Sequence, residues 1–193
     1  MLGGFLEAVV RSATPLGFAA VGELVAERSG VINLGLEGSI ACGALAAFAV
    51  AQSAGPEVGF VAGGLAGVTI ALIFAFFVLA LRAQQVIVGA AVSMLGLGVT
   101  AILNRALVSR STAIGHVETL SSIRIPFLAD IPVIGTALFS QPLSTYILYA
   151  LFPLIGWILY RTIGGIALRA VGERPEAAVA AGHSPTAFGF LRF

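Results

Sequence analysis

The chain has 193 residues, of which 59% are hydrophobic and only 10% are charged, and its mean hydropathy is +1.05. Soluble domains usually carry about 25% charged residues, so this composition indicates a membrane protein. Ten basic and nine acidic residues give a net charge of +1, which argues against a nucleic-acid-binding surface. The two histidines lie far apart and the single cysteine stands in an apolar run, so we expect no metal and no cofactor.

Hydrophobic runs recur along the chain at lengths that suit a membrane, whose hydrocarbon core takes about 20 mostly apolar residues to cross. The first run, 5–26, contains three charged residues and Pro15, and is the least clear span. The second run, 40–54, is long enough only if its helix starts near Val31 and carries Glu37 inside it. Three further runs carry no charge: 58–81, 86–103 and 143–160. The sequence therefore predicts an all-α, polytopic membrane helix bundle with about five transmembrane helices.

The connections between these runs differ in length. Residues 52–57 and 82–85 are typical of tight turns between antiparallel helices. A longer connection, 104–142, contains an apolar patch at 131–139 that is too short to span. We expect this patch to lie on the membrane surface or to form a re-entrant piece.

The spans are rich in small residues at helical spacing. Such stripes let helix backbones approach closely, which matters in lipid because hydrophobicity cannot drive helices together there. We interpret them as packing faces, with a solute path as the alternative for Ser93. The stripes are Gly59, Gly63 and Gly67 on one span and Gly89, Ser93 and Gly96 on the next.

Polar residues interrupt the apolar pattern between the first two spans. Glu27, Arg28 and Ser29 indicate a cytoplasmic turn, where charges are solvated. Asn33 and Glu37 are expected one helical turn apart on one helix face, where lipid exposure would be costly. Glycines at positions 30, 35 and 38 would loosen this helix start, so that both side chains face the protein interior. There they would pair with a neighbouring helix or line the inner mouth of a path.

The C-terminal residues 161–190 are arginine-rich and are predicted to form a cytoplasmic loop. This orientation places the N-terminus outside if the first run spans the membrane, and inside if it does not. Within the loop, "ERPEAAVAAG" predicts a helix: Pro175 suits its first turn, Glu176 its positive end, and Gly182 its stop. Two turns, about 10 Å, are too short to be stable alone, so we expect this helix to dock on another surface.

Three blocks in order make the sequence recognisable: "ATPLGFAAVGELVAERSGVINLGLEG", "AQQVIVGAAVSMLGLG" and "YRTIGGIALRAVGERPEAAVAAGHS". Together they resemble the permease subunits of bacterial importers powered by an ATP-binding cassette. The resemblance is to the branch of nucleoside and simple-sugar permeases related to the ribose transporter. It implies a multi-pass protein of the inner membrane that forms one transmembrane domain, 1–193, with no catalytic site of its own. Nucleosides are the expected cargo, with ribose-like sugars next.

The resemblance also implies partners. A cytoplasmic ATPase would drive the path, a second permease subunit would complete it, and an extracytoplasmic solute-binding protein would deliver the solute. The nucleoside branch favours two different permeases over a homodimer. The predicted short helix matches the coupling helix that seats in the ATPase. Its expected coupling residues are Gly172, Glu173, Pro175, Ala177, Ala178, Ala181 and Gly182.

The chain departs from the family pattern in two short motifs and in length. Gln84 stands where relatives often carry asparagine in an Ala-Asn-Gln triplet, and Ser93 stands where asparagine is common. Family members normally continue with further spans after the coupling loop, so we expect an incomplete permease, either a fragment or a truncated gene product. The candidates for lining the path or pairing helices are Asn33, Glu37, Gln84, Gln85 and Ser93.

Two other classes of membrane protein are the alternatives. A secondary transporter or channel without an ATPase would explain intramembrane charge, but the sequence offers no matching inverted repeat. An intramembrane hydrolase needs a nucleophile and a base on facing helices, and no such pair stands out.

Overall fold

The computed structural model describes residues 2–110, 119–129, 131 and 134–174. The chain divides into two compact units. The first unit comprises Met1–Val25 and Leu120–Ile166, and the second comprises Ala26–Thr119 and Ala167–Phe193.

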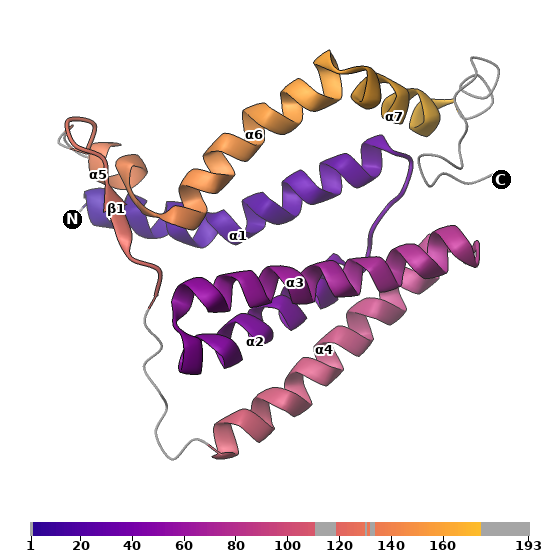
Figure 1. Cartoon of the computed structure of the whole chain (residues 1–193), viewed down its shortest axis with the longest axis horizontal. Coiled ribbons are helices and arrows are strands. Elements are labelled where there is room, and N and C mark those ends of the chain that lie inside the picture. The colour runs from indigo at the N-terminus through magenta and orange to yellow at the C-terminus, as the bar shows by residue number, and fades with distance from the viewer. Residues whose placement is uncertain (1, 111–118, 130, 132–133, 175–193) are drawn as a thin grey trace. The chain divides into compact units, whose positions relative to one another are not determined.

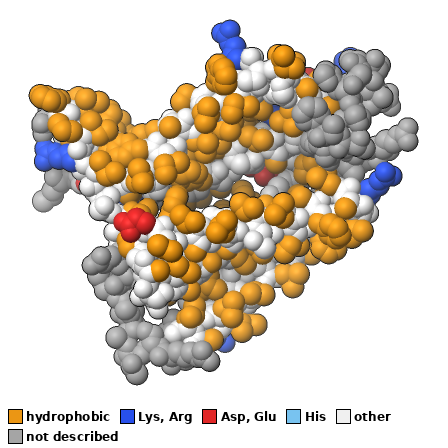
Figure 2. All heavy atoms as spheres, viewed as in Figure 1, with side chains coloured by type: hydrophobic (Ala, Val, Ile, Leu, Met, Phe, Trp, Pro, Cys, Tyr) orange, Lys and Arg blue, Asp and Glu red, His pale blue; other side chains and the backbone are white. Residues whose placement is uncertain are grey.

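Five helices among the described residues are long and apolar enough to cross a membrane, which confirms the predicted polytopic helical fold (Figure 1). Apolar side chains cover most of the helical surface in the view of Figure 2, as expected for helices that are surrounded by lipid. The first run, the least clear in the sequence, is one of the five. They are Leu2–Arg28, Leu36–Ala54, Pro56–Ala80, Gln85–Leu107 and Leu143–Arg161.

The first unit holds two long helices, α1 (Leu2–Arg28) and α6 (Leu143–Arg161). The last three residues of α1 belong to the second unit. The two helices meet through two buried hydroxyls, since Thr14 Oγ1 and Thr145 Oγ1 are 3.0 Å apart. Thr14 also donates to the carbonyl of Val10 at 2.9 Å. Lipid supplies no hydrogen-bond partners, so these mutual bonds satisfy groups that would otherwise be costly to bury.

A small sheet that the sequence did not reveal precedes α6. β1 (Ser122–Arg124) pairs antiparallel with β2 (Ser140–Pro142), and Ile123 lies opposite the fully buried Gln141. Strands of three residues are too short to produce a recognisable alternation of apolar and polar residues. The apolar patch of this connection ends in the six-residue helix α5 (Ile134–Phe139), so it forms no sixth span within the described residues.

In the second unit, α2 (Leu36–Ala54) packs against both α3 (Pro56–Ala75) and α4 (Gln85–Arg110). The predicted tight turn between α2 and α3 is confirmed: Gly55 alone separates the helices, and Pro56 occupies the first turn of α3. Gly55 has φ +92°, a left-handed conformation that side chains disfavour.

The α3 helix continues into a π-helical turn, η1 (Phe76–Ala80), which completes the third span. Arg82 then has φ +53°, and α4 starts at Gln85, so the predicted turn at 82–85 is confirmed.

Small residues join α3 to α2, as the glycine stripe predicts. A Cβ atom on Gly59 would lie 2.7 Å from the carbonyl oxygen of Ala47, and one on Gly63 would lie 2.8 Å from that of Gly43. Backbones this close leave no room for a larger side chain, so both glycines are packing residues. The third glycine, Gly67, has its nearest neighbour at 4.0 Å, an ordinary contact.

The first part of the predicted cytoplasmic segment 161–190 is helical, since α7 (Ile163–Glu173) follows α6 after one residue, and its side of the membrane stays a prediction. Thr162 caps α7: its hydroxyl accepts from Gly165 N at 3.1 Å and donates to Ile158 O at 2.6 Å. Within α7, Ala167 and Val171 are buried four residues apart, so they lie on one face of the helix.

Candidate functional site

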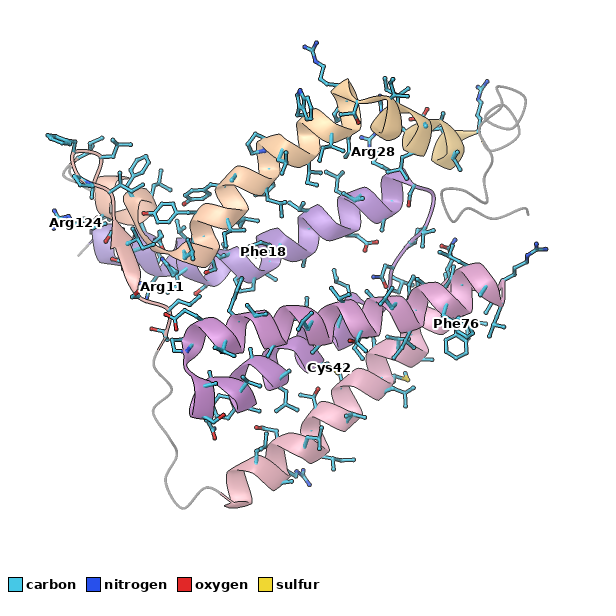
Figure 3. All side chains as sticks on the ribbon, in the orientation of Figure 1. Arg11, Phe18, Arg28, Cys42, Phe76 and Arg124 are labelled. Carbon is cyan, nitrogen blue, oxygen red and sulfur yellow. The ribbon has the colours of Figure 1, made fainter. Side chains whose placement is uncertain are left out.

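The second unit contains an irregular connection between α1 and α2 that several predicted site residues share. The α1 helix ends at Arg28 in a Schellman motif: Gly30 N donates to Glu27 O at 2.9 Å, and Val31 N donates to Ala26 O at 3.1 Å. Gly30 occupies the left-handed position that this motif requires, with φ +87°. Figure 3 labels Arg28 at the end of α1, just before the connection. A turn is thus present at the predicted place, but Glu27 and Arg28 end the helix and the turn itself is formed by Ser29 and Gly30; its cytoplasmic position stays a prediction.

Residues 31–35, here called the junction segment, are not helical, so α2 starts at Leu36 and not near Val31. Asn33 instead closes a local turn, since its Oδ1 accepts from Gly35 N at 3.0 Å. The prediction that Asn33 and Glu37 lie one turn apart on one helix is therefore wrong. This side-chain-to-backbone bond competes with helical hydrogen bonding, which is the physical reason for the late helix start.

Glu37 lies in the first turn of α2 with an exposed side chain. Its carboxylate makes no hydrogen bond or ion pair with any residue that the structure describes, and the expected inward orientation is not observed. An acidic group at this position is favoured by the partial positive charge at the helix N-terminus.

The α4 helix holds the junction segment through one of the two adjacent glutamines. Gln85 Oε1 accepts from the backbone N–H of Ile32 at 2.9 Å, and the Gln85 side chain is half-buried. The Gln84 side chain is exposed. Both glutamines were predicted to share one role, although only Gln85 continues the helical face of Gly89, Ser93 and Gly96, and this spacing distinguishes them.

The predicted stripe on α4 is confirmed as a packing face against the junction segment and α2. A Cβ atom on Gly89 would lie 2.7 Å from Leu34 Cβ, and one on Gly96 would lie 2.6 Å from Gly38 Cα. Between them, Ser93 is buried and its hydroxyl donates to Leu34 O at 2.8 Å. This hydrogen bond uses the Ser93 hydroxyl for packing, which disfavours the alternative in which Ser93 faces a solute.

Only the first two predicted coupling residues fall in the described part of the chain. Gly172 and Glu173 end α7, and Glu173 is exposed. Gly172 packs directly on the end of α1, a contact that sequence reasoning missed. A Cβ atom on Gly172 would lie 2.5 Å from Arg28 O and 2.9 Å from Gly30 N. The other predicted coupling residues lie outside the described residues: Pro175, Ala177, Ala178, Ala181 and Gly182.

An apolar groove of about 500 Å³ runs between α2 and α4. Of its nine lining residues only Cys42 and Thr100 carry polar side-chain atoms, and both are engaged. Thr100 Oγ1 lies 3.7 Å from Cys42 Sγ, which in turn lies 3.7 Å from Gly96 O (Figure 3 labels Cys42). The groove therefore offers too few hydrogen-bond groups to orient a polar solute. No group of three metal-ligating side chains occurs within the ranges that the structure describes.

Comparison with known proteins gives a family match and several relatives. The family described as branched-chain amino acid transport system / permease component matches residues 5–193. A Haloferax volcanii protein, provisionally named a glucose ABC transporter permease, is 35% identical over 97% of this chain and 57% of its own length. A guanosine ABC transporter permease of Bacillus subtilis is 37% identical over 86% of this chain and 54% of its own.

A nucleoside ABC transporter permease of Lactococcus lactis is 30% identical over 86% of this chain and 54% of its own length. The chain thus spans about half the length of the curated relatives it matches. No solved structure matches it.

Proposed function

Because this chain belongs to the family of branched-chain amino acid transport system permease components, we propose that it acts as a transmembrane subunit of an ATP-driven importer. It is a multi-pass protein of the plasma membrane. The observation that carries the proposal is the family match over residues 5–193, and the five spans support it. The chain forms part of one permease domain, in which it serves as a membrane subunit and leaves ATP hydrolysis to a partner chain.

Nucleosides are the proposed cargo, and simple sugars are the second candidate. The names of two relatives specify guanosine and nucleosides, and the name of the third specifies glucose. The groove between α2 and α4 is too apolar to select either cargo, so solute selection falls to other surfaces. An extracytoplasmic binding protein is the proposed source of that selection.

The proposed coupling site is the loop 161–190, which receives a cytoplasmic ATPase. Its described part, α7, ends in Gly172 and the exposed Glu173, immediately before the predicted two-turn helix. A second permease subunit, different from this one, would complete the path. Asn33 remains a proposed candidate for its inner mouth, whereas the exposed position of Glu37 at the start of α2 and the bonds of Gln85 and Ser93 favour structural roles.

Reconstituted uptake tests the proposal. The complete transporter is placed in liposomes with its ATPase and binding protein, and labelled guanosine uptake is measured with ATP or a non-hydrolysable analogue inside. We expect uptake only with ATP, and competition by unlabelled nucleosides that exceeds competition by ribose. Deleting residues 173–182 should abolish both co-purification of the ATPase and uptake.

Uptake driven by a proton or sodium gradient without the ATPase would overturn the proposal and favour a secondary transporter. Stronger competition by ribose or glucose than by nucleosides would support the importer function but would make simple sugars, and not nucleosides, the cargo.

A further inference from the structure

Two glycines from distant parts of the chain meet where α7 reaches the end of α1. Gly172 lies against the backbone of the Schellman turn, so that a Cβ atom there would be 2.5 Å from Arg28 O and 2.9 Å from Ser29 C. The approach is reciprocal, since a Cβ atom on Gly30 would be 3.2 Å from Gly172 Cα. A backbone atom cannot give way to such a Cβ atom by a rotamer change, so the two backbones are in direct contact and a side chain at Gly172 would force them apart.

Of the three glycines on α7, Gly172 is the one whose nearest neighbours lie in the turn at the end of α1; Gly165 instead packs on α6, where its Cβ atom would lie 2.6 Å from Leu159 Cα. Gly164, in the first turn of the same helix, has open space around it: a Cβ atom there would meet nothing within 4 Å. General tolerance of α7 for glycine therefore does not explain why Gly172 is a glycine. Close approach to the turn does.

The turn that Gly172 touches leads directly into the junction segment, residues 31–35. This segment is fixed to α4 by two hydrogen bonds, Ile32 N to Gln85 Oε1 at 2.9 Å and Ser93 Oγ to Leu34 O at 2.8 Å. Because the segment is short and bonded along its length, displacement of the turn must act on α4 or on the start of α2. A physical route thus runs from the last turn of α7 to the packing face of α4.

We propose that Gly172 and Gly30 are positioning residues that transmit movement of the ATPase-docking loop to the junction segment and α4. This inference rests on the proposed function and assigns these glycines a role in coupling ATP hydrolysis to the movement of helices. The backbone contact acts as a stiff link because no flexible side chain lies between the two elements. Gln85 holds the far end of the same link.

The test compares Gly172→Ala with Gly164→Ala in the complete reconstituted transporter. ATPase co-purification, ATP hydrolysis and solute uptake are measured on the same preparations. We expect Gly172→Ala to retain the ATPase and its hydrolysis while uptake per ATP falls about tenfold, the scale of a typical coupling between two sites. Gly164→Ala should match the wild type. Equal uptake per ATP in both variants would overturn the proposal.

A second pair of variants decides the matter if Gly172→Ala fails to assemble. Gln85→Ala removes the bond to Ile32, and Gln52→Ala, at an exposed position near the end of α2, is the matched control. Gln85→Ala should lower uptake per ATP several-fold more than Gln52→Ala, and equal effects would refute the link. If the wild type shows no ATP-dependent uptake, the proposed function itself fails, which is a distinct result.

Discussion

Replacing Gly96 by alanine should force α4 away from α2, because the two backbones are already in contact. The new Cβ atom would lie 2.6 Å from Gly38 Cα, whereas ordinary contacts begin at 3.4 Å, so the helices must separate locally by about 0.8 Å. A gap of 0.5–1 Å forfeits roughly a quarter to a half of the dispersion energy of the atoms around it. Overpacking of this kind typically costs about 1–3 kcal/mol.

The matched control is Gly98→Ala, two residues along the same helix, where a Cβ atom would meet nothing within 4 Å. Alanine favours the helix over glycine by about 0.5–1 kcal/mol, so this control should be neutral or slightly stabilising. The two substitutions are chemically identical, and only Gly96→Ala is predicted to lower stability.

Cys42 provides the assay because it is the only cysteine in the chain and its sulfur lies 3.7 Å from Gly96 O. Labelling of the detergent-solubilised protein by a maleimide dye reports opening between α2 and α4. Since 1.4 kcal/mol is a factor of ten, a net cost of about 1–2 kcal/mol should accelerate labelling by roughly 5- to 30-fold in Gly96→Ala. Equal labelling rates in the two variants would refute the close packing of these helices.

Three further predictions concern single side chains. Ser93→Ala should lower the free energy of unfolding by about 0.6–1.7 kcal/mol, since Leu34 O loses its partner, and thermal denaturation in detergent measures this. Unchanged stability with lost uptake would instead assign Ser93 to the solute path. Thr162→Ala should cost about 1 kcal/mol by removing the cap on Gly165 N, measured in the same way against Thr162→Ser, which keeps the hydroxyl. Glu37→Gln should lower stability by about 0.3–1 kcal/mol and leave uptake intact, because the exposed carboxylate interacts mainly with the helix N-terminus. Loss of uptake at unchanged stability would place Glu37 on a solute or a partner chain.

The features that the sequence predicted correctly depend on residues close together along the chain. Apolar length identifies the spans, Gly55 followed by Pro56 identifies the hairpin, and the stripe from Gly89 to Gly96 identifies a packing face. Each of these signals lies within one continuous segment of the sequence. Such local signals remain visible without knowledge of the partner element.

The remaining features depend on contacts between distant residues or on competing local bonds. The junction segment depends on Asn33 closing a turn, a choice that a helical pattern disguises. The contact of Gly172 with Arg28 and Gly30 joins opposite ends of the chain, and no window around either position contains it. Hydropathy could not separate Gln85 from Gln84, but the helical spacing could have done so.

The single-glycine link at Gly55 has a consequence for how the chain enters the membrane during synthesis. Of the five spans, the one formed by α3 and η1 is the most apolar, whereas α2 is among the least apolar and carries Glu37 in its first turn. With only one residue between them, neither helix can be released into the bilayer far from the other. The favourable transfer of α3 into lipid therefore also draws in α2, and the weakly apolar span inserts as one arm of a helical hairpin.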